Sequence, residues 1–183
     1  MFEIILASKS KVRKEMLDKN GISARVEPSS VDEDIVKRSL LKDKAPPEII
    51  SKNLAELKAN KVSNKIKDFM VLGADSVIDL DGELISKPRD REEAIEILKK
   101  LNGQKHNLIS SVCISRNGSM IWNYTDKASL TMKQFTDEKL REYFSEEQMV
   151  ELTFRITLCT FFNKFNDVMQ LEMEDSQLLY FKK

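Results

Sequence analysis

Apolar and polar positions change their spacing several times near the start of the chain, and this predicts strands and helices in succession. Residues 2–7 are almost wholly apolar and predict a buried strand. Residues 9–20 carry apolar side chains on one face and end at Gly21, which predicts a helix. An alternating segment at about 22–27 predicts a short strand. Residues 35–45 are charged and weakly patterned, which allows a mobile flap.

The middle of the chain predicts a long helix and then a series of strands. Pro46-Pro47 opens a helix that continues to about Lys65, because proline is tolerated in a first helical turn. Residues 69–72 predict a strand that ends at Gly73-Ala74-Asp75-Ser76, and the hairpin after it turns at Asp81-Gly82. The elements expected later are a helix at 91–101, strands at 106–115 and 120–133, and a helix from 136 or 137 to about 145. Helices between early strands and hairpins between late ones indicate a mixed sheet in an α/β or α+β fold.

Composition and charge narrow the class of protein. Hydrophobic residues make up 41% of the 183 residues, enough for the core of one domain or two packed lobes. Lys and Arg total 30, as do Asp and Glu, so we expect no nucleic-acid partner and only a local site for anions. No signal peptide is visible, and no apolar run approaches the roughly 20 residues of a membrane span. We therefore expect a cytoplasmic protein without membrane contact.

The first predicted helix begins with hydroxyl and cationic side chains. Ser8, Ser10, Arg13 and Lys14 follow directly on the first strand. Free backbone N–H groups and the helix dipole attract anions at such a position, so these residues are candidates for binding phosphate. The chain has no Gly-rich loop here, which excludes a P-loop. Helix capping alone also explains the serines.

Carboxylates and lysines follow other predicted elements. Asp75 comes after the strand that Gly73 ends, and Glu33 lies in the loop after the short strand. Lys58 lies on the long helix, and Lys87 follows the hairpin. Because ligands bind at strand ends in α/β sheets, this set suits a hydrolase acting on a phosphoanhydride. Carboxylates would hold a Mg²⁺-like ion or orient water, and cations would neutralise phosphate oxygens.

Each candidate also has a structural interpretation. Asp75 could simply cap its own turn. Glu33 could be a solvated acid in a charged loop. Lys58 also suits the surface of a helix, and Lys87 precedes proline. His106, the only histidine, and the well-separated Cys113 and Cys159 indicate structural roles and reduced core thiols rather than a metal site.

An ordered set of short motifs covers residues 2 to about 145. These motifs are Ile5-Leu6-Ala7-Ser8-Lys9-Ser10, Arg13-Lys14, Asp32-Glu33, Leu54 to Ala59, Gly73 to Val77, Asp81-Gly82, Lys87-Pro88, Ala94 to Leu101, Gly103 and His106 to Val112. In this order and spacing they resemble the Maf family of nucleoside triphosphate pyrophosphatases, known also from septum formation. The resemblance implies an elongated mixed sheet with flanking helices and a central cleft between two lobes, as in the inosine triphosphatases.

The resemblance also implies a reaction and a set of site residues. It implies hydrolysis of a nucleoside triphosphate, canonical or modified, to the monophosphate and pyrophosphate, with Mg²⁺ or Mn²⁺ as the divalent cation. Asp75 would activate water and contact the metal, and Glu33 would bind the metal or position the nucleotide. The residues expected to bind the triphosphate are Ser8, Ser10, Arg13, Lys14, Lys58 and Lys87. Lys14 stands where the family often has a second arginine, and a lysine lacks its bidentate fork.

The end of the chain departs from the family pattern. We expect residues 1–148 to form the Maf-like domain, and residues 149–183 to be an atypical tail, since this stretch contains no glycine or proline. The tail leaves two alternatives to catalysis: a nucleotide-binding regulator of cell division without turnover, or the product of a disrupted gene. The Phe and Met side chains of the tail would favour a homodimer, and the preferred base is open.

Overall fold

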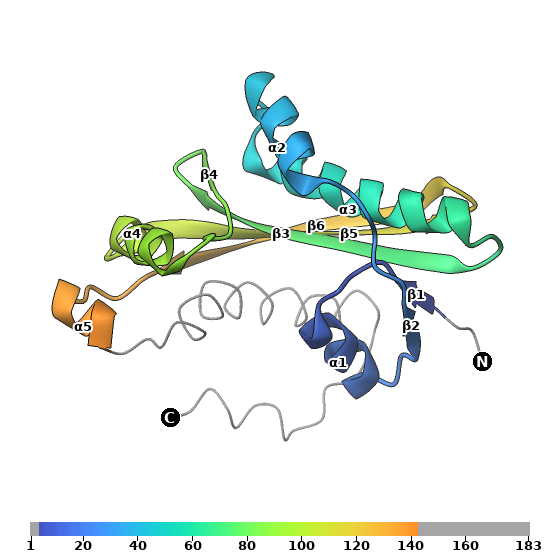
Figure 1. The fold of residues 1–183 in the computed structure, drawn as a ribbon, viewed down its shortest axis with the longest axis horizontal. Helices are drawn as coiled ribbons and strands as arrows, with labels where there is room; N and C mark the ends of the chain where they lie inside the picture. The colour runs from blue at the N-terminus through green and yellow to red at the C-terminus, as the bar shows by residue number, and fades with distance from the viewer. Residues whose placement is uncertain (1–3, 143–183) are drawn as a thin grey trace.

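The computed structural model describes residues 4–142 (Figure 1). The expectations for residues 143–148 and for the tail at 149–183 lie outside the described residues. The strands are β1 (Ile4–Leu6), β2 (Ala24–Val26), β3 (Met70–Leu80), β4 (Glu83–Ile85), β5 (Lys105–Arg116) and β6 (Ser119–Thr131). The helices are α1 (Lys11–Lys19), α2 (Glu33–Lys42), α3 (Pro47–Lys65), α4 (Arg91–Leu101) and α5 (Asp137–Glu142). None of the described helices is both long and apolar enough to cross a membrane.

The six strands form one mixed sheet, which confirms the expected fold class. Their order is β2-β1-β3-β5-β6, and β4 pairs with β3 off this path. β1 is parallel to β2 and β3, whereas β5 is antiparallel to β3 and β6. β1 pairs with β3 only along Met70–Leu72, and β4 pairs only along Ile78–Leu80. Within the described part of the chain, the edge of β3 between these two segments therefore has no strand partner.

Helices cover both faces of the sheet (Figure 1). α3 packs on one face, where Ala55 and Ala59 contact Cys113 of β5 in the core. α1 packs on the other face, where Leu17 joins a cluster with Leu6. α3 also comes very close to β3, because a Cβ added at Gly73 would lie 2.3 Å from a backbone oxygen of the helix. Glycine is therefore required at this contact rather than at a turn.

One prediction from the sequence is wrong, and one helix was not expected. The strand expected to end near residue 72 instead continues without a break to Leu80, so Asp75 lies in the middle of a strand. The glycine that suggested a turn serves the contact with α3 described above. The segment at 35–45, for which the sequence suggested no regular element, is mostly helix, capped by the Asp32 side chain, which accepts a hydrogen bond from Ile35 N at 3.1 Å. Its pattern is weak because α2 contains no buried residue.

Other predictions are confirmed within a few residues. The helix expected at 91–101 has those bounds, and the turn at Asp81-Gly82 joins β3 to β4. His106 is buried in β5, and Cys113 is a buried free thiol. Cys159 lies outside the described residues.

Candidate functional site

A cavity of about 510 Å³ lies beside the edge of β3 that neither β1 nor β4 covers, between Leu72 and Ile78. Its walls come from the loop after β1, the first turn of α1, helices α2 and α3, and the segment after β4. The charged side chains that line it are Lys9, Arg13, Glu33, Lys37, Lys58, Asp75 and Lys87. Cations outnumber acids in this set, so the cavity suits an anionic ligand.

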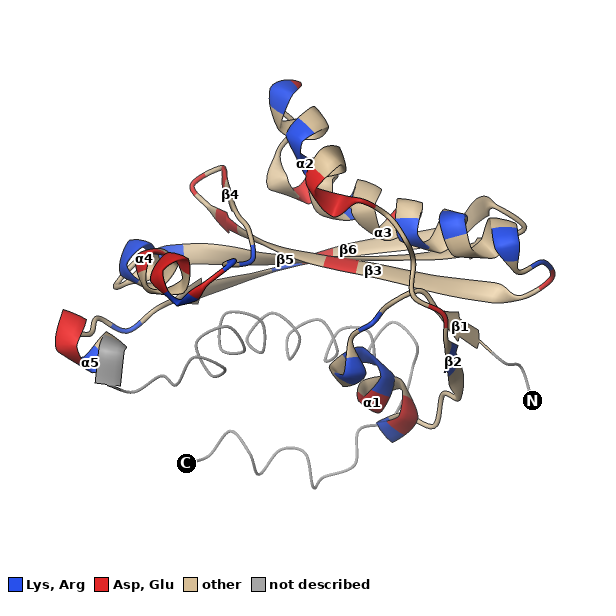
Figure 2. Cartoon of the chain, viewed as in Figure 1, with Lys and Arg blue, Asp and Glu red and all other residues tan. Residues whose placement is uncertain are grey.

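Asp75 is the buried acid of this cavity. The long strands carry few charges compared with the helices (Figure 2), and Asp75 is only 5% exposed. Its Oδ1 accepts a hydrogen bond from Lys58 Nζ at 2.7 Å, whereas Oδ2 has no hydrogen-bond partner among the described residues. Burial raises the pKa of Asp75, and the Lys58 ammonium offsets only part of this rise.

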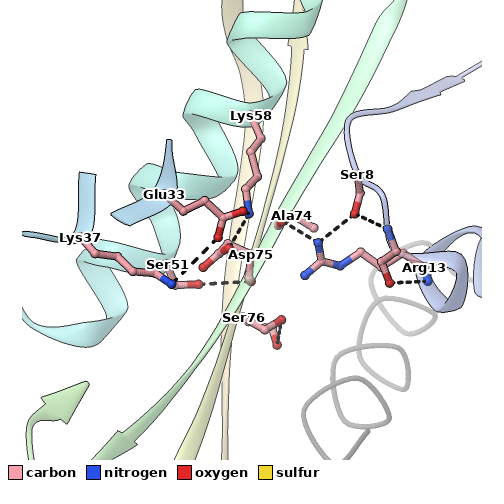
Figure 3. Close-up of polar contacts among 11 residues, drawn as sticks. Ser8, Arg13, Glu33, Lys37, Ser51, Lys58, Ala74, Asp75 and Ser76 are labelled. Carbon is pink, nitrogen blue, oxygen red and sulfur yellow. Dashed lines mark hydrogen bonds and ion pairs between the residues drawn. The ribbon is translucent and has the colours of Figure 1, made fainter. Parts of the chain in front are cut away.

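Lys58 connects the two carboxylates of the cavity. It projects from the middle of α3, and its Nζ lies 2.7 Å from Asp75 Oδ1 and 2.8 Å from Glu33 Oε1 (Figure 3). Glu33 is the first residue of α2 rather than part of a loop. Burial by itself raises the pKa of Glu33, but Lys58 and Lys37 outweigh it, and the pKa lies below its ordinary value. Glu33 is therefore held as an anion beside the buried lysine.

Arg13 forms the opposite wall of the cavity (Figure 3). Ser10 caps α1 by accepting a hydrogen bond from Arg13 N at 3.3 Å, which fixes the first turn. Arg13 Nη1 then donates to Ser8 Oγ at 3.2 Å and to Ala74 O at 2.9 Å, so it binds the backbone of β3 next to Asp75. Burial lowers the pKa of Arg13, and the Asp75 and Glu33 carboxylates offset part of this shift.

Most of the residues expected from the sequence lie in this one cavity. Ser8, Ser10, Arg13, Glu33, Lys58, Asp75 and Lys87 all line it. Lys14 is the exception: it does not line the cavity and forms an ion pair with Asp18 one turn along α1. Burial at the cavity wall lowers the pKa of Lys87, with Glu33 opposing, although Lys87 stays exposed to solvent overall.

The sequence interpretation missed several polar residues of this region, among them Lys37 and Ser51. Lys37 lines the cavity from α2, one turn after Glu33. The signal for it was the Asp32 cap, which marks the start of α2 and places both charges on one face. Ser51 of α3 is buried, and its Oγ donates to Asp75 O at 3.2 Å. No pattern in the sequence marks Ser51, because its partner belongs to β3.

The arrangement predicts a measurable coupling between the two acids. In protein without added divalent cation, we expect a pKa for Asp75 above its ordinary value, because burial is the largest cause of its shift. The charge of Glu33 raises the pKa of Asp75, and Glu33 shares the Lys58 ammonium with it. In Glu33→Gln that anion is gone and Lys58 pairs with Asp75 alone, so the pKa of Asp75 falls. A carboxyl ¹³C titration by NMR measures both values, with the exposed Glu48→Gln on α3 as control. An Asp75 pKa that stays the same or rises in Glu33→Gln contradicts the coupling.

Comparison of the sequence with known proteins shows the family of the chain. The model of the family described as Maf-like protein matches residues 3–153. A nucleoside triphosphate pyrophosphatase of Pelagibacter ubique is 70% identical over 144 residues, which cover 79% of this chain and 74% of that protein. One of a Ruegeria species is 41% identical over 140 residues, covering 76% and 70%. A solved dITP/XTP pyrophosphatase from Mycobacterium abscessus is 14% identical at a TM-score of 0.44, covering 70% and 72%. On the family match and the sequence identities, the chain belongs to the Maf family.

Proposed function

We propose that this protein hydrolyses a nucleoside triphosphate to the monophosphate and pyrophosphate. The observation that carries the proposal is the buried Asp75 carboxylate in a cavity whose charged lining residues are mostly cations. The relatives named nucleoside triphosphate pyrophosphatase support the same reaction class. In this reaction a water oxygen forms a bond to phosphorus, and the bond from that phosphorus to the pyrophosphate oxygen breaks. The site must therefore supply a proton acceptor and neutralise the charge of the leaving group.

Asp75 is the proposed proton acceptor. Its Oδ1 is fixed by Lys58, while Oδ2 has no hydrogen-bond partner among the described residues and suits a water molecule or a cation. A raised pKa makes this carboxylate a stronger base than an exposed aspartate. Lys58 keeps the carboxylate in one orientation, which lowers the cost of reaching the reactive geometry.

The triphosphate is proposed to bind through the hydroxyl and cationic side chains of the walls. Ser8 and Ser10 lie at the N-terminus of α1, where backbone N–H groups attract phosphate. Arg13 and Lys87 line the same cavity and carry positive charge. Lys14 keeps its proposed role only if it leaves its ion pair with Asp18. These charges act best in a partly closed cavity, where water screens them less.

A divalent cation fits the acids of this cavity. Mg²⁺ commonly binds one or two carboxylates together with phosphate oxygens of the substrate. The described residues hold no group of three or more His, Cys, Asp and Glu side chains suited to a metal, so the triphosphate would complete the coordination. Asp75 suits the ion through its Oδ2, and Glu33 supplies the second carboxylate. Bound there, Mg²⁺ or Mn²⁺ would supply positive charge to the phosphate oxygens.

A product assay tests the proposal. The full chain is incubated with Mg²⁺ or Mn²⁺ and a panel of canonical and modified nucleoside triphosphates. We expect equimolar monophosphate and pyrophosphate, separated by anion-exchange chromatography, and no product once the cation is chelated. Orthophosphate with a nucleoside diphosphate would show a different cleavage and reject the proposal. If nucleotide stabilises the protein against heat but no product forms, the protein binds nucleotides without hydrolysing them, and the proposal is rejected.

A further inference from the structure

Lys37 lies in the cavity without a role in the proposed reaction. It follows Glu33 by one helical turn, so both side chains point to the same side of α2. The Lys37 side chain is 15% exposed, although its helix contains no buried residue. The neighbouring charged residues Asp34, Arg38 and Lys42 are exposed. Lys37 is therefore turned inward, toward the centre of the site (Figure 3).

The contact between Lys37 and Glu33 is loose. Lys37 Nζ lies 4.0 Å from Glu33 Oε2, whereas Lys58 Nζ lies 2.8 Å from Glu33 Oε1. A hydrogen bond between an ammonium and a carboxylate is shorter than 4.0 Å, so Glu33 attracts Lys37 by charge but does not use its N–H donors. The described residues include no hydrogen-bond acceptor for the Lys37 ammonium. A half-buried cation with available donors is suited to receive an anion.

Two other cations of the cavity, Arg13 and Lys58, are already engaged within the protein. Arg13 donates to Ser8 and to the backbone of β3. Lys58 contacts both carboxylates. Lys37 is joined to Asp75 through Glu33 and Lys58, so it lies close to the reacting group without binding it directly. Its charge adds to the net positive potential of the cavity, and its donors remain for the ligand.

We propose that Lys37 is a further substrate-binding residue, and that it binds the pyrophosphate portion of the nucleoside triphosphate. This inference rests on the function proposed above. The outer phosphates carry most of the substrate's charge, and the leaving pyrophosphate gains charge as the bond breaks. A lysine ammonium is a compact point charge that pairs with such oxygens without a fixed orientation. Lys37 therefore acts on the leaving group, while Asp75 acts on water.

Direct binding tests the assignment without turnover. Isothermal titration of the full chain with inorganic pyrophosphate and with a nucleoside monophosphate compares the wild type with Lys37→Gln. One charge-assisted contact implies a pyrophosphate Kd on the order of 10- to 100-fold higher in Lys37→Gln, with monophosphate affinity changed by less than about twofold. Arg38→Gln is the matched control, because Arg38 lies on the same helix, is exposed and does not line the cavity. Lys37→Arg is expected to keep most of the pyrophosphate affinity.

The outcomes separate this inference from the function beneath it. If Lys37→Gln binds pyrophosphate as tightly as the wild type does, or loses both ligands equally, Lys37 does not take the leaving group. If the wild type binds neither pyrophosphate nor a nucleoside triphosphate, the proposed function fails as well. A cooperative thermal transition in Lys37→Gln close to that of Arg38→Gln shows that the fold is kept, so the comparison remains valid.

Discussion

Replacing Asp75 with asparagine is expected to lower kcat for pyrophosphate release by about 10³-fold, because a positioned general base typically contributes 10²- to 10⁴-fold. In the wild type, Lys58 Nζ donates a hydrogen bond to Asp75 Oδ1 at 2.7 Å. The asparagine amide has nearly the same shape and keeps an oxygen that can accept this hydrogen bond. The variant should therefore fold. Single-turnover assays at saturating nucleoside triphosphate measure the chemical step apart from substrate binding.

Asp79→Asn is the matched control for this variant. Asp79 lies on the same strand and is also buried, but it does not line the cavity. Its Oδ1 accepts a hydrogen bond from Gly82 N at 2.7 Å, so its role is to hold the turn of the hairpin. We expect this variant to lose some stability and to keep its activity. If Asp75→Asn keeps kcat within about tenfold of the wild type, less than a general base normally contributes, Asp75 is not that base.

Replacing Lys58 with methionine is expected to give a large loss of stability. Lys58 and Asp75 are 6% and 5% exposed, and removing Lys58 leaves the buried Asp75 charge with only the weaker attraction of Arg13. Such a change costs about 3–5 kcal/mol in the free energy of unfolding. The pKa of Asp75 then rises further, and below that pKa the neutral carboxyl no longer incurs the cost of burying a charge. The loss should therefore be larger at pH 7 than at pH 5, as measured by urea unfolding.

A double variant separates this electrostatic effect from lost packing. In Lys58→Met with Asp75→Asn both buried charges are gone, so much of the stability should return. Lys61→Met is the control on the same helix: Lys61 is exposed, and its Nζ donates to Ser30 O at 2.8 Å. We expect that change to have little effect. Equal destabilisation by Lys58→Met at both pH values, with no recovery in the double variant, would contradict the electrostatic explanation.

The sequence predicted the elements that have a strong local pattern. The bounds of α4 and the turn at Asp81-Gly82 could be read directly, because helical spacing and turn residues are local signals. The α/β class followed from the order of these elements. Most of the site residues predicted from the sequence also lie together in the structure. Ser8, Arg13 and Asp75, for example, line one cavity.

What the sequence could not provide depends on contacts between distant segments. Gly73 is a turn signal when read locally, but its function is to let α3 approach β3, a contact between segments distant in sequence. Helix α2 was missed because a helix that buries no residue leaves only a weak apolar stripe. Lys37 was missed with it, since its inward direction follows from the placement of α2.

The contact at Gly73 helps to set the distance between the Lys58 and Asp75 side chains. Asp75 lies two residues along the strand from this glycine, and Lys58 precedes the alanine that the glycine faces. The backbones of the strand and the helix are thus in contact immediately beside the ion pair. The separation of the two charges therefore depends on a contact between uncharged residues. A larger residue at Gly73 or Ala59 is therefore expected to change the separation of the two charges, and with it the basicity of the carboxylate.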